Sequence, residues 1–166
     1  MTYNSILRGG FMDKGHVVEH LRAAKAAHIK WVQKAKLLIS GLEVQEDAIP
    51  VDSTECKFGK WFYGEGQVLN SLSNNPPECM SKIENLHFQL HDTYLKIFSV
   101  YFGKKEGGFF AKMFGIKRKS INEHEKQAAV TYYNEMEAIS KELIDEINRL
   151  ERRLIAVADE RIKNLI

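Results

Sequence analysis

The chain has 166 residues, of which 44% are hydrophobic and 28% are charged. This size and composition predict one folded domain with a sizeable core, and they exclude a chain that is disordered by composition. The 24 basic and 22 acidic residues give a formal net charge of +2. The chain as a whole therefore lacks the positive charge typical of nucleic-acid-binding proteins, and we expect no nucleic-acid partner.

Hydrophobic runs and cysteine usage indicate a compartment. No apolar run approaches the roughly 20 residues that a membrane-spanning helix requires. Residues 1–15 lack the basic start and apolar run of a secretory signal. The two cysteines, Cys56 and Cys79, are too few for a disulfide framework and suit a reducing compartment. We therefore expect a cytoplasmic protein.

An apolar stripe predicts the first helix, from about 14 to 40. Its inward positions alternate in spacings of four and three residues, as a buried helical face does. Asp13 can cap its start and Gly41 can cap its end. His28 occupies one of the inward positions, where an imidazole needs a partner for each ring nitrogen. This buried histidine therefore calls for a functional explanation.

Residues 41–55 are rich in acidic and loop-forming side chains and predict a connection. The sequence CKFGKWFYGEG follows at 56–66 and predicts one or two short helical turns, packed on a bundle through their aromatic rings. Prolines at 76 and 77 end this segment and begin another helix. The inward row of that helix contains His87, and His91 follows one turn later.

The C-terminal third divides into a connection and a helix. Residues 103–119 are basic and glycine-rich; contact with an anionic membrane surface is one interpretation, and we favour a solvated loop. Ser120 and Glu123 have the spacing of a capping box. An apolar repeat then continues to residue 166 and predicts one long helix, which is either broken or packs on a partner chain with its C-terminal half.

These elements together predict the fold class. No segment alternates apolar and polar residues as a half-buried strand would. We expect an all-α protein, with residues 1–166 forming a single antiparallel domain like a four-helix bundle. A short helix carries the cysteine motif, and a long helix spans 120–166.

A group of possible metal ligands is distributed over these elements. His87 and His91 lie four residues apart, so their imidazoles project from one helix face. Residue 88 is phenylalanine, so the H-E-x-x-H pattern of zinc proteases is absent. Adding His28 and Cys56 gives three imidazoles and one thiolate, which is the saturated tetrahedral donor set that Zn²⁺ prefers. Four protein ligands leave no open position, so we expect no enzymatic activity.

The same motifs resemble the chemoreceptor zinc-binding (CZB) family, most strongly over residues 13–102. The resemblance rests on H-x-x-W at 28–31, C-x-F-G-K-W at 56–61 and H-x-x-x-H at 87–91. It implies a helical bundle that binds one Zn²⁺ through His28, Cys56, His87 and His91. It also implies a cytoplasmic regulatory module, often dimeric, that reports zinc availability or hypochlorous acid through its cysteine.

Members of this family are commonly fused to bacterial chemoreceptors or diguanylate cyclases, so the resemblance implies a role in signal transduction such as chemotaxis. The 166 residues leave no room for either output domain. We therefore expect a homodimer that acts on a separate signalling protein. The alternative is a permanent structural zinc ion in a protein whose last helix serves dimerisation or docking. A metal-dependent hydrolase or a thiol peroxidase is the third and weakest interpretation.

Cys56 is the predicted mobile ligand and redox switch. Cysteine binds zinc as a thiolate, whose charge Lys57, Lys60 and the start of a helix would favour. Oxidation to sulfenic acid would weaken this ligand, and Gly59 is expected to leave its loop free to move.

The remaining aromatic, histidine and cysteine side chains are given supporting roles. Trp31, Phe58 and Trp61, with the neighbouring rings at 62 and 63, are expected to form a hydrophobic lid that excludes water from the site. His16, His20 and His124 are expected to face solvent or helix ends. Cys79 is expected to be a partly exposed thiol without a functional role.

Overall fold

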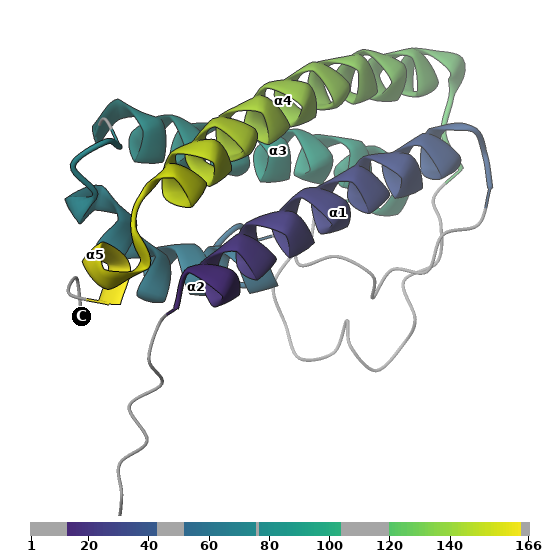
Figure 1. Ribbon diagram of the computed structural model, residues 1–166. Helices are drawn as coiled ribbons and strands as arrows, with labels where there is room; N and C mark the ends of the chain where they lie inside the picture. Colours follow the sequence, from purple (N-terminus) through teal and green to yellow (C-terminus); the bar gives the residue numbers. More distant parts are fainter. Residues whose placement is uncertain (1–12, 43–51, 76, 104–119, 164–166) are drawn as a thin grey trace, which may run out of the picture.

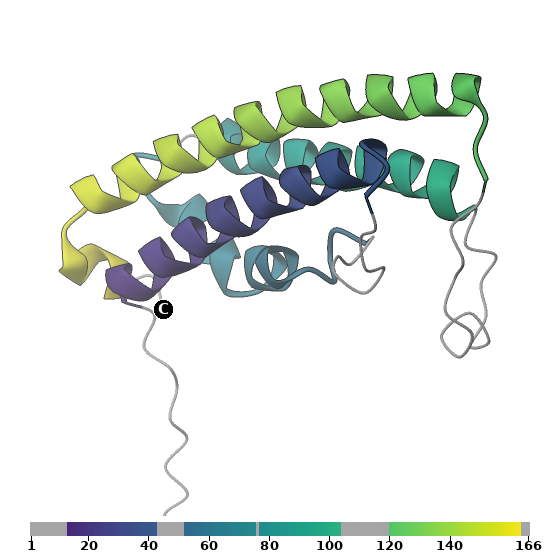
Figure 2. The same cartoon turned by 90° about the vertical axis from the view of Figure 1, so that its right-hand side faces the viewer.

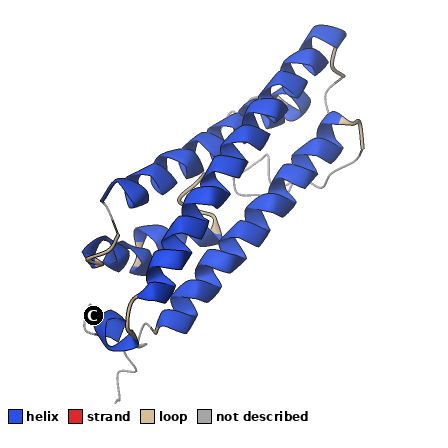
Figure 3. Cartoon of the chain, turned by 45° about the horizontal axis from the view of Figure 1, so that its top comes forward, coloured by secondary structure: helices blue, strands red, loops and turns tan. Residues whose placement is uncertain are grey.

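The structure is a computed structural model that describes residues 13–42, 52–75, 77–103 and 120–163. Every regular element among these residues is a helix (Figure 3), which confirms the all-α prediction. In chain order the elements are α1 (Lys14–Ile39), α2 (Lys57–Tyr63), the 3₁₀ helix η2 (Glu65–Ser71), α3 (Pro77–Phe102), α4 (Glu123–Ala156) and α5 (Asp159–Lys163).

Three long helices form the body of the bundle. Helices α1 and α3 run in the same direction, and α4 runs antiparallel to both and packs along both (Figures 1 and 2). The short elements α2 and η2 lie beside α1 and α3 and lead the chain back to the start of α3. The arrangement is therefore an antiparallel, four-helix-bundle-like fold in which α2 and η2 replace one long helix.

Helix α1 has the boundaries that its capping residues predict. The Asp13 carboxylate accepts a hydrogen bond from the backbone N–H of His16 at 2.8 Å. Gly41 adopts a φ of 88°, a left-handed conformation that favours glycine at the end of a helix. Its inward row from Val17 to Leu38 is buried, so the predicted stripe faces the core.

The core lies between α3 and α4 and is covered by α1. The α3 row contains Ile83, Leu90 and Ile97, all fully buried. Two buried carboxylates on α4 link it to its neighbours: Glu151 pairs with Arg22 of α1 at 2.7 Å, and Glu146 pairs with Lys82 of α3, also at 2.7 Å. These contacts fix α4 as the element against which both α1 and α3 are aligned.

Helix α4 begins two residues later than the Ser120–Glu123 pair predicts. Its N-cap is Asn122, whose side chain accepts from the backbone N–H of Glu125 at 2.9 Å. The Glu125 carboxylate accepts from the backbone N–H of Asn122, also at 2.9 Å, so this pair forms the capping box. Ser120 and Asn122 are both favourable N-cap residues and lie two positions apart, so the sequence alone does not distinguish them.

The C-terminal helix is broken, which confirms the first of the two alternatives predicted for residues 120–166. Helix α4 ends at Ala156, and Val157 is extended with a ψ of 139°. Helix α5 follows, and its Ile162 is only 2% exposed. Lys14 at the start of α1 pairs with Asp159 at 2.7 Å. The break thus buries Val157 and Ile162 within the same chain.

Among the described residues, no helix is both long and apolar enough to span a bilayer. The basic segment considered for contact with a membrane surface, 104–119, lies outside the described residues.

Candidate metal centre

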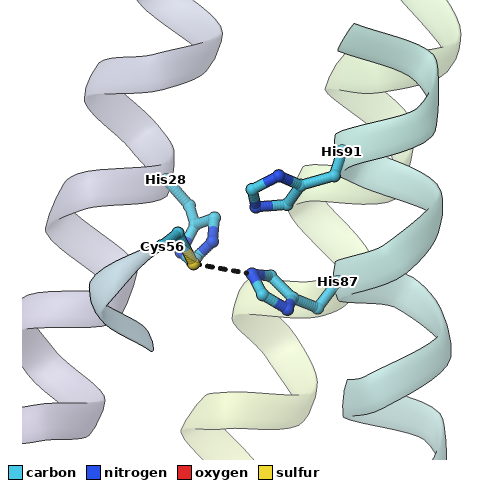
Figure 4. A group of neighbouring side chains, drawn as sticks. All are labelled: His28, Cys56, His87 and His91. Atoms are coloured by element: carbon cyan, nitrogen blue, oxygen red, sulfur yellow. Dashed lines mark hydrogen bonds between the residues drawn. The ribbon is translucent and has the colours of Figure 1, made fainter. Parts of the chain in front are cut away.

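Four donor side chains from three helical elements converge between α1, α2 and α3 (Figure 4). His28 comes from the middle of α1, Cys56 precedes α2, and His87 and His91 project from successive turns of α3. One candidate ligand atom from each residue lies within 4.8 Å of all the others. The structure therefore brings together all four residues that the sequence analysis proposed as ligands.

The spacing and chemistry of these donors suit a tetrahedral zinc ion. Zinc bonds of about 2.0 to 2.3 Å place the ligand atoms of a tetrahedral site about 3.3 to 3.6 Å apart. The Sγ of Cys56 and the Nε2 of His87 are 3.3 Å apart, and the widest separation in the group needs to shorten by about 1 Å. Imidazole and thiolate donors favour zinc over magnesium or calcium, which take oxygen ligands.

His28 is held in the orientation that a metal ligand needs. Its Nδ1 lies 2.7 Å from the backbone oxygen of Ala24, one turn earlier on α1. Donation of the Nδ1 proton to this carbonyl leaves Nε2 unprotonated and able to bind a metal. The ring is 3% exposed, so the tautomer and orientation are set by α1 itself.

His87 is fully buried and directs Nε2 toward the cysteine sulfur. Its Nδ1 is also buried and has no hydrogen-bond partner among the described residues. An imidazole with no exposed surface and an unpaired nitrogen is costly in a core. Metal binding at Nε2 would provide part of the compensation that packing alone does not.

Cys56 is the N-cap of α2 and not a residue of a mobile loop. Its Sγ accepts a hydrogen bond from the backbone N–H of Gly59 at 3.2 Å and lies 3.4 Å from the backbone oxygen of Ser53. A Cβ atom added to Gly59 would lie 1.9 Å from that same oxygen. Gly59 is therefore needed for close approach of two backbone segments, and the mobility expected of Cys56 stays a prediction.

Burial keeps His28, His87 and Cys56 uncharged in the metal-free protein at neutral pH. It lowers the pKa of His28, and it lowers the pKa of His87 to about 2, with further contributions from His28 and His91. It also raises the pKa of the Cys56 thiol. The predicted effect of Lys60 is present but smaller than that of burial, because Lys60 pairs with Glu55 in solvent at 3.0 Å. A bound cation would have to supply the charge that stabilises a thiolate.

These pKa values predict how the stability of the metal-free protein depends on pH. The pKa of His87 is lower in the folded state than in the unfolded state, so below about pH 6.5 the unfolded chain binds more protons and folding is weakened. We expect the free energy of unfolding to fall by about 2 kcal/mol between pH 7 and pH 5 for this residue. Urea unfolding at the two pH values measures the change. Between the same pH values, the free energy of unfolding of metal-free His87→Leu should fall by about 2 kcal/mol less than that of the wild type. An equal fall in both proteins would show that His87 is not the source of the pH dependence.

The aromatic residues predicted to cover the site have different positions. The Phe58 ring packs edge-on against His28 and His87, and the Trp31 ring lies 4.2 Å from the His91 ring. Trp61 stacks on His20, with the rings 5.3 Å apart and nearly parallel. Phe62 is buried in the core, whereas Tyr63 is 40% exposed.

These rings do not seal the site. An open groove of about 870 Å³ reaches it from the surface between α1 and α2, and its lining includes His28, Cys56 and His91. The expected exclusion of water is therefore incomplete. His87 is the one candidate ligand that does not line the groove.

The histidines and the cysteine expected to lie outside the site do so. His16, His20 and His124 are exposed, although His20 contacts Trp61 in a stack that the sequence analysis missed. Cys79 is 5% exposed and therefore buried, not partly exposed as expected. The Ala24 carbonyl was also missed, although it precedes His28 by four residues, the spacing at which a helical side chain can reach a backbone acceptor.

The comparison with family models decides which family this arrangement represents. Residues 28–98 match the model of the chemoreceptor zinc-binding domain. This match supports the assignment of residues 28–98 to the CZB family. The matched segment begins at His28 and includes Cys56, His87 and His91, so all four clustered donors lie within the CZB domain. Neither the comparison with curated proteins nor the comparison with solved structures gave a match.

Proposed function

We propose that this CZB protein is a non-enzymatic regulatory module that binds one Zn²⁺ through His28, Cys56, His87 and His91. The observation that carries the proposal is the convergence of these four donors within 4.8 Å in the part of the chain that matches a zinc-binding family. When bound, zinc would supply the positive charge that holds Cys56 as a thiolate. The three histidines orient it from the rigid helices α1 and α3.

Four protein donors also support the absence of catalysis. A catalytic zinc ion keeps one coordination position for water or substrate, whereas a structural or regulatory ion has four protein ligands. The buried, uncharged imidazoles of His28 and His87 are poor proton donors at neutral pH. Their role in this proposal is to hold the ion.

Oxidation of Cys56 is the proposed signal alongside zinc availability. Hypochlorous acid would oxidise the thiolate to a sulfenic acid and release chloride, and the weaker sulfur ligand would favour loss of the ion. The Cys56 side chain is partly exposed and lines the groove, so a small oxidant can reach it. Zinc release by hypochlorous acid, measured with a chromophoric chelator, should occur in the wild type before Cys79 is modified.

The readout of this state requires a partner. We propose a homodimer in the cytoplasm that acts on a separate signalling protein of the chemoreceptor or cyclase type. Two free thiols, at Cys56 and Cys79, suit the reducing cytoplasm. The four donors come from α1, α3 and the residue before α2. Binding or loss of the ion would therefore change how these helices pack, and a partner would detect that change.

Native mass spectrometry of the purified protein tests the site and the subunit count together. We expect one zinc ion per chain in the wild type and loss of that ion in His28→Ala, Cys56→Ala, His87→Ala and His91→Ala. His20→Ala and Cys79→Ala are matched controls that should retain zinc, because neither residue belongs to the cluster. Absence of metal in the wild type, or its retention in all four ligand variants, would exclude the site.

A structural zinc ion is the second candidate, and the position of Cys56 favours it. The cysteine caps α2, so a bound ion would join α2 to α1 and α3 permanently. The rate of zinc transfer to a chelator separates the two functions. Transfer within minutes at physiological chelator strength would support sensing, and no transfer over a day would support a structural role.

A further inference from the structure

The groove beside the metal centre has the size and shape of a small-molecule site. Its volume is about 870 Å³, within the range of roughly 300 to 1,000 Å³ that is typical of ligand pockets. It lies between α1 and α2, and the candidate zinc ligands His28, Cys56 and His91 form part of its surface. A molecule in the groove would therefore touch the metal centre without replacing any of its four donors.

The two walls of the groove differ in a way that selects a flat ligand. Helix α1 contributes Ala23, Ala24 and Ala27, whose small side chains leave the space open. The opposite wall includes Phe58 and Trp61, both at least nine-tenths buried. An aromatic ring could lie on the alanines and pack against these rings, a contact that contributes about 0.5 to 1.5 kcal/mol beyond area burial.

The groove also has polar features that favour a negatively charged ligand. Lys57 and Lys60 line it together with Glu55. Lys60 pairs with Glu55 at 3.0 Å, whereas Lys57 has no ion pair within the described residues, so these three side chains carry a net positive charge.

The indole rings add apolar surface to the groove. The side chains of Trp31 and Trp61 line it, and their Nε1–H groups are buried away from solvent, so the rings present carbon to an occupant. This wall favours an aromatic ligand, and the lysines favour its negative charge.

We propose that the groove is a binding site for a compact aromatic anion, such as an aromatic carboxylate or sulfonate. The occupant lies on Ala27, has its negative group near Lys57, and covers the face of Cys56 that lines the groove. This site does not depend on the zinc function proposed above, because its walls are formed by α1 and α2 in the metal-free structure. Its occupancy would control access of small reagents to the cysteine.

The test uses 1-anilinonaphthalene-8-sulfonate as the probe, with its fluorescence measured on zinc-loaded and metal-free protein. We expect one probe molecule per chain in both states. Ala27→Phe fills the groove and should weaken binding at least about tenfold. Ala26→Phe is the matched control, because Ala26 is exposed on the same helix and does not line the groove. Equal binding by these two variants, or no binding by the wild type, would overturn the proposal.

A second pair of variants tests the charge and does not alter the packing of the groove. Lys57→Glu should weaken probe binding about threefold to tenfold. Lys30→Glu, an exposed α1 position outside the groove, makes the same change in net charge and should have no effect. If circular dichroism shows that Ala27→Phe loses helicity, the comparison of Lys57→Glu with Lys30→Glu becomes the deciding test. Equal probe affinity in these two variants would overturn the proposal.

Protection of Cys56 tests the position of the bound probe. In metal-free Cys79→Ala, alkylation of Cys56 by iodoacetamide should slow about tenfold at a probe concentration ten times its Kd. An unchanged rate under saturation would place the probe elsewhere and overturn the proposed site. Loss of zinc binding in the mass spectrometry experiment would leave this measurement unaffected, so failure of either proposal can be recognised separately.

Discussion

Removal of zinc at pH 7 should lower the free energy of unfolding by several kcal/mol. If the ion binds the folded chain as proposed and joins α1, α2 and α3, a free zinc concentration 1,000 times the Kd would stabilise the fold by about 4 kcal/mol. The three histidines are buried, so the metal-free state retains the uncharged imidazoles of His28 and His87 in its core. Urea unfolding with and without saturating zinc at pH 7 measures the difference.

The ligand variants provide the control for this prediction. Metal-free Cys56→Ala should unfold at a somewhat lower urea concentration than metal-free wild type, because it loses the N-cap of α2, a cost of about 0.5 to 2 kcal/mol. Addition of zinc should stabilise the wild type and leave Cys56→Ala nearly unchanged. A wild type that gains nothing from zinc, or a Cys56→Ala variant that gains as much as the wild type, would contradict the proposed coordination.

Gly59→Ala should be the single substitution outside the ligands that damages the centre most. The added Cβ atom would lie 1.9 Å from the backbone oxygen of Ser53 and 2.9 Å from its carbon, so the segment before α2 must move. We expect a loss of about 1 to 3 kcal/mol from the free energy of unfolding. Displacement of the neighbouring Cys56 should also weaken zinc binding about 10- to 100-fold, the range found when groups that support a ligand are altered.

Competition with a chelator of known affinity measures the zinc Kd of this variant, and urea unfolding measures its stability. Gly15→Ala is the matched control because its nearest contact is the Asp13 carboxylate oxygen, 3.0 Å away at the end of a movable side chain. It should bind zinc like the wild type. Wild-type affinity in Gly59→Ala would show that Cys56 has the freedom of movement that the sequence analysis assigned to it.

The long helices were predictable because their sequence patterns are local and repeated. The stripe that contains Val17, Leu21 and Leu38 defines the buried face of α1, and Asp13 and Gly41 mark its ends through backbone chemistry that needs no tertiary information. The break at Val157 was not predictable in the same way. The apolar repeat continues through it, and only packing of α5 near the start of α1 shows why the helix ends.

The convergence of the donor residues was predictable for the same reason, since His28 and His87 occupy inward positions on two helices. The surroundings of Cys56 were not predictable from the sequence. The close approach of Gly59 to Ser53 joins two backbone segments that have no sequence pattern in common. The open groove likewise depends on the space between α2 and the three alanines of α1. Hydrophobic periodicity does not predict that tertiary spacing.

Helix α4 packs along both α1 and α3, while α1 and α3 have few backbone contacts with each other. The donors lie in front of α4, in the gap between these two helices (Figure 4). With zinc bound as proposed, the separation of α1 and α3 is restrained by packing on one side and by coordination on the other. Loss of the Cys56 bond alone would leave His28, His87 and His91 joining α1 to α3, whereas loss of the ion would leave that separation restrained by packing on α4 alone.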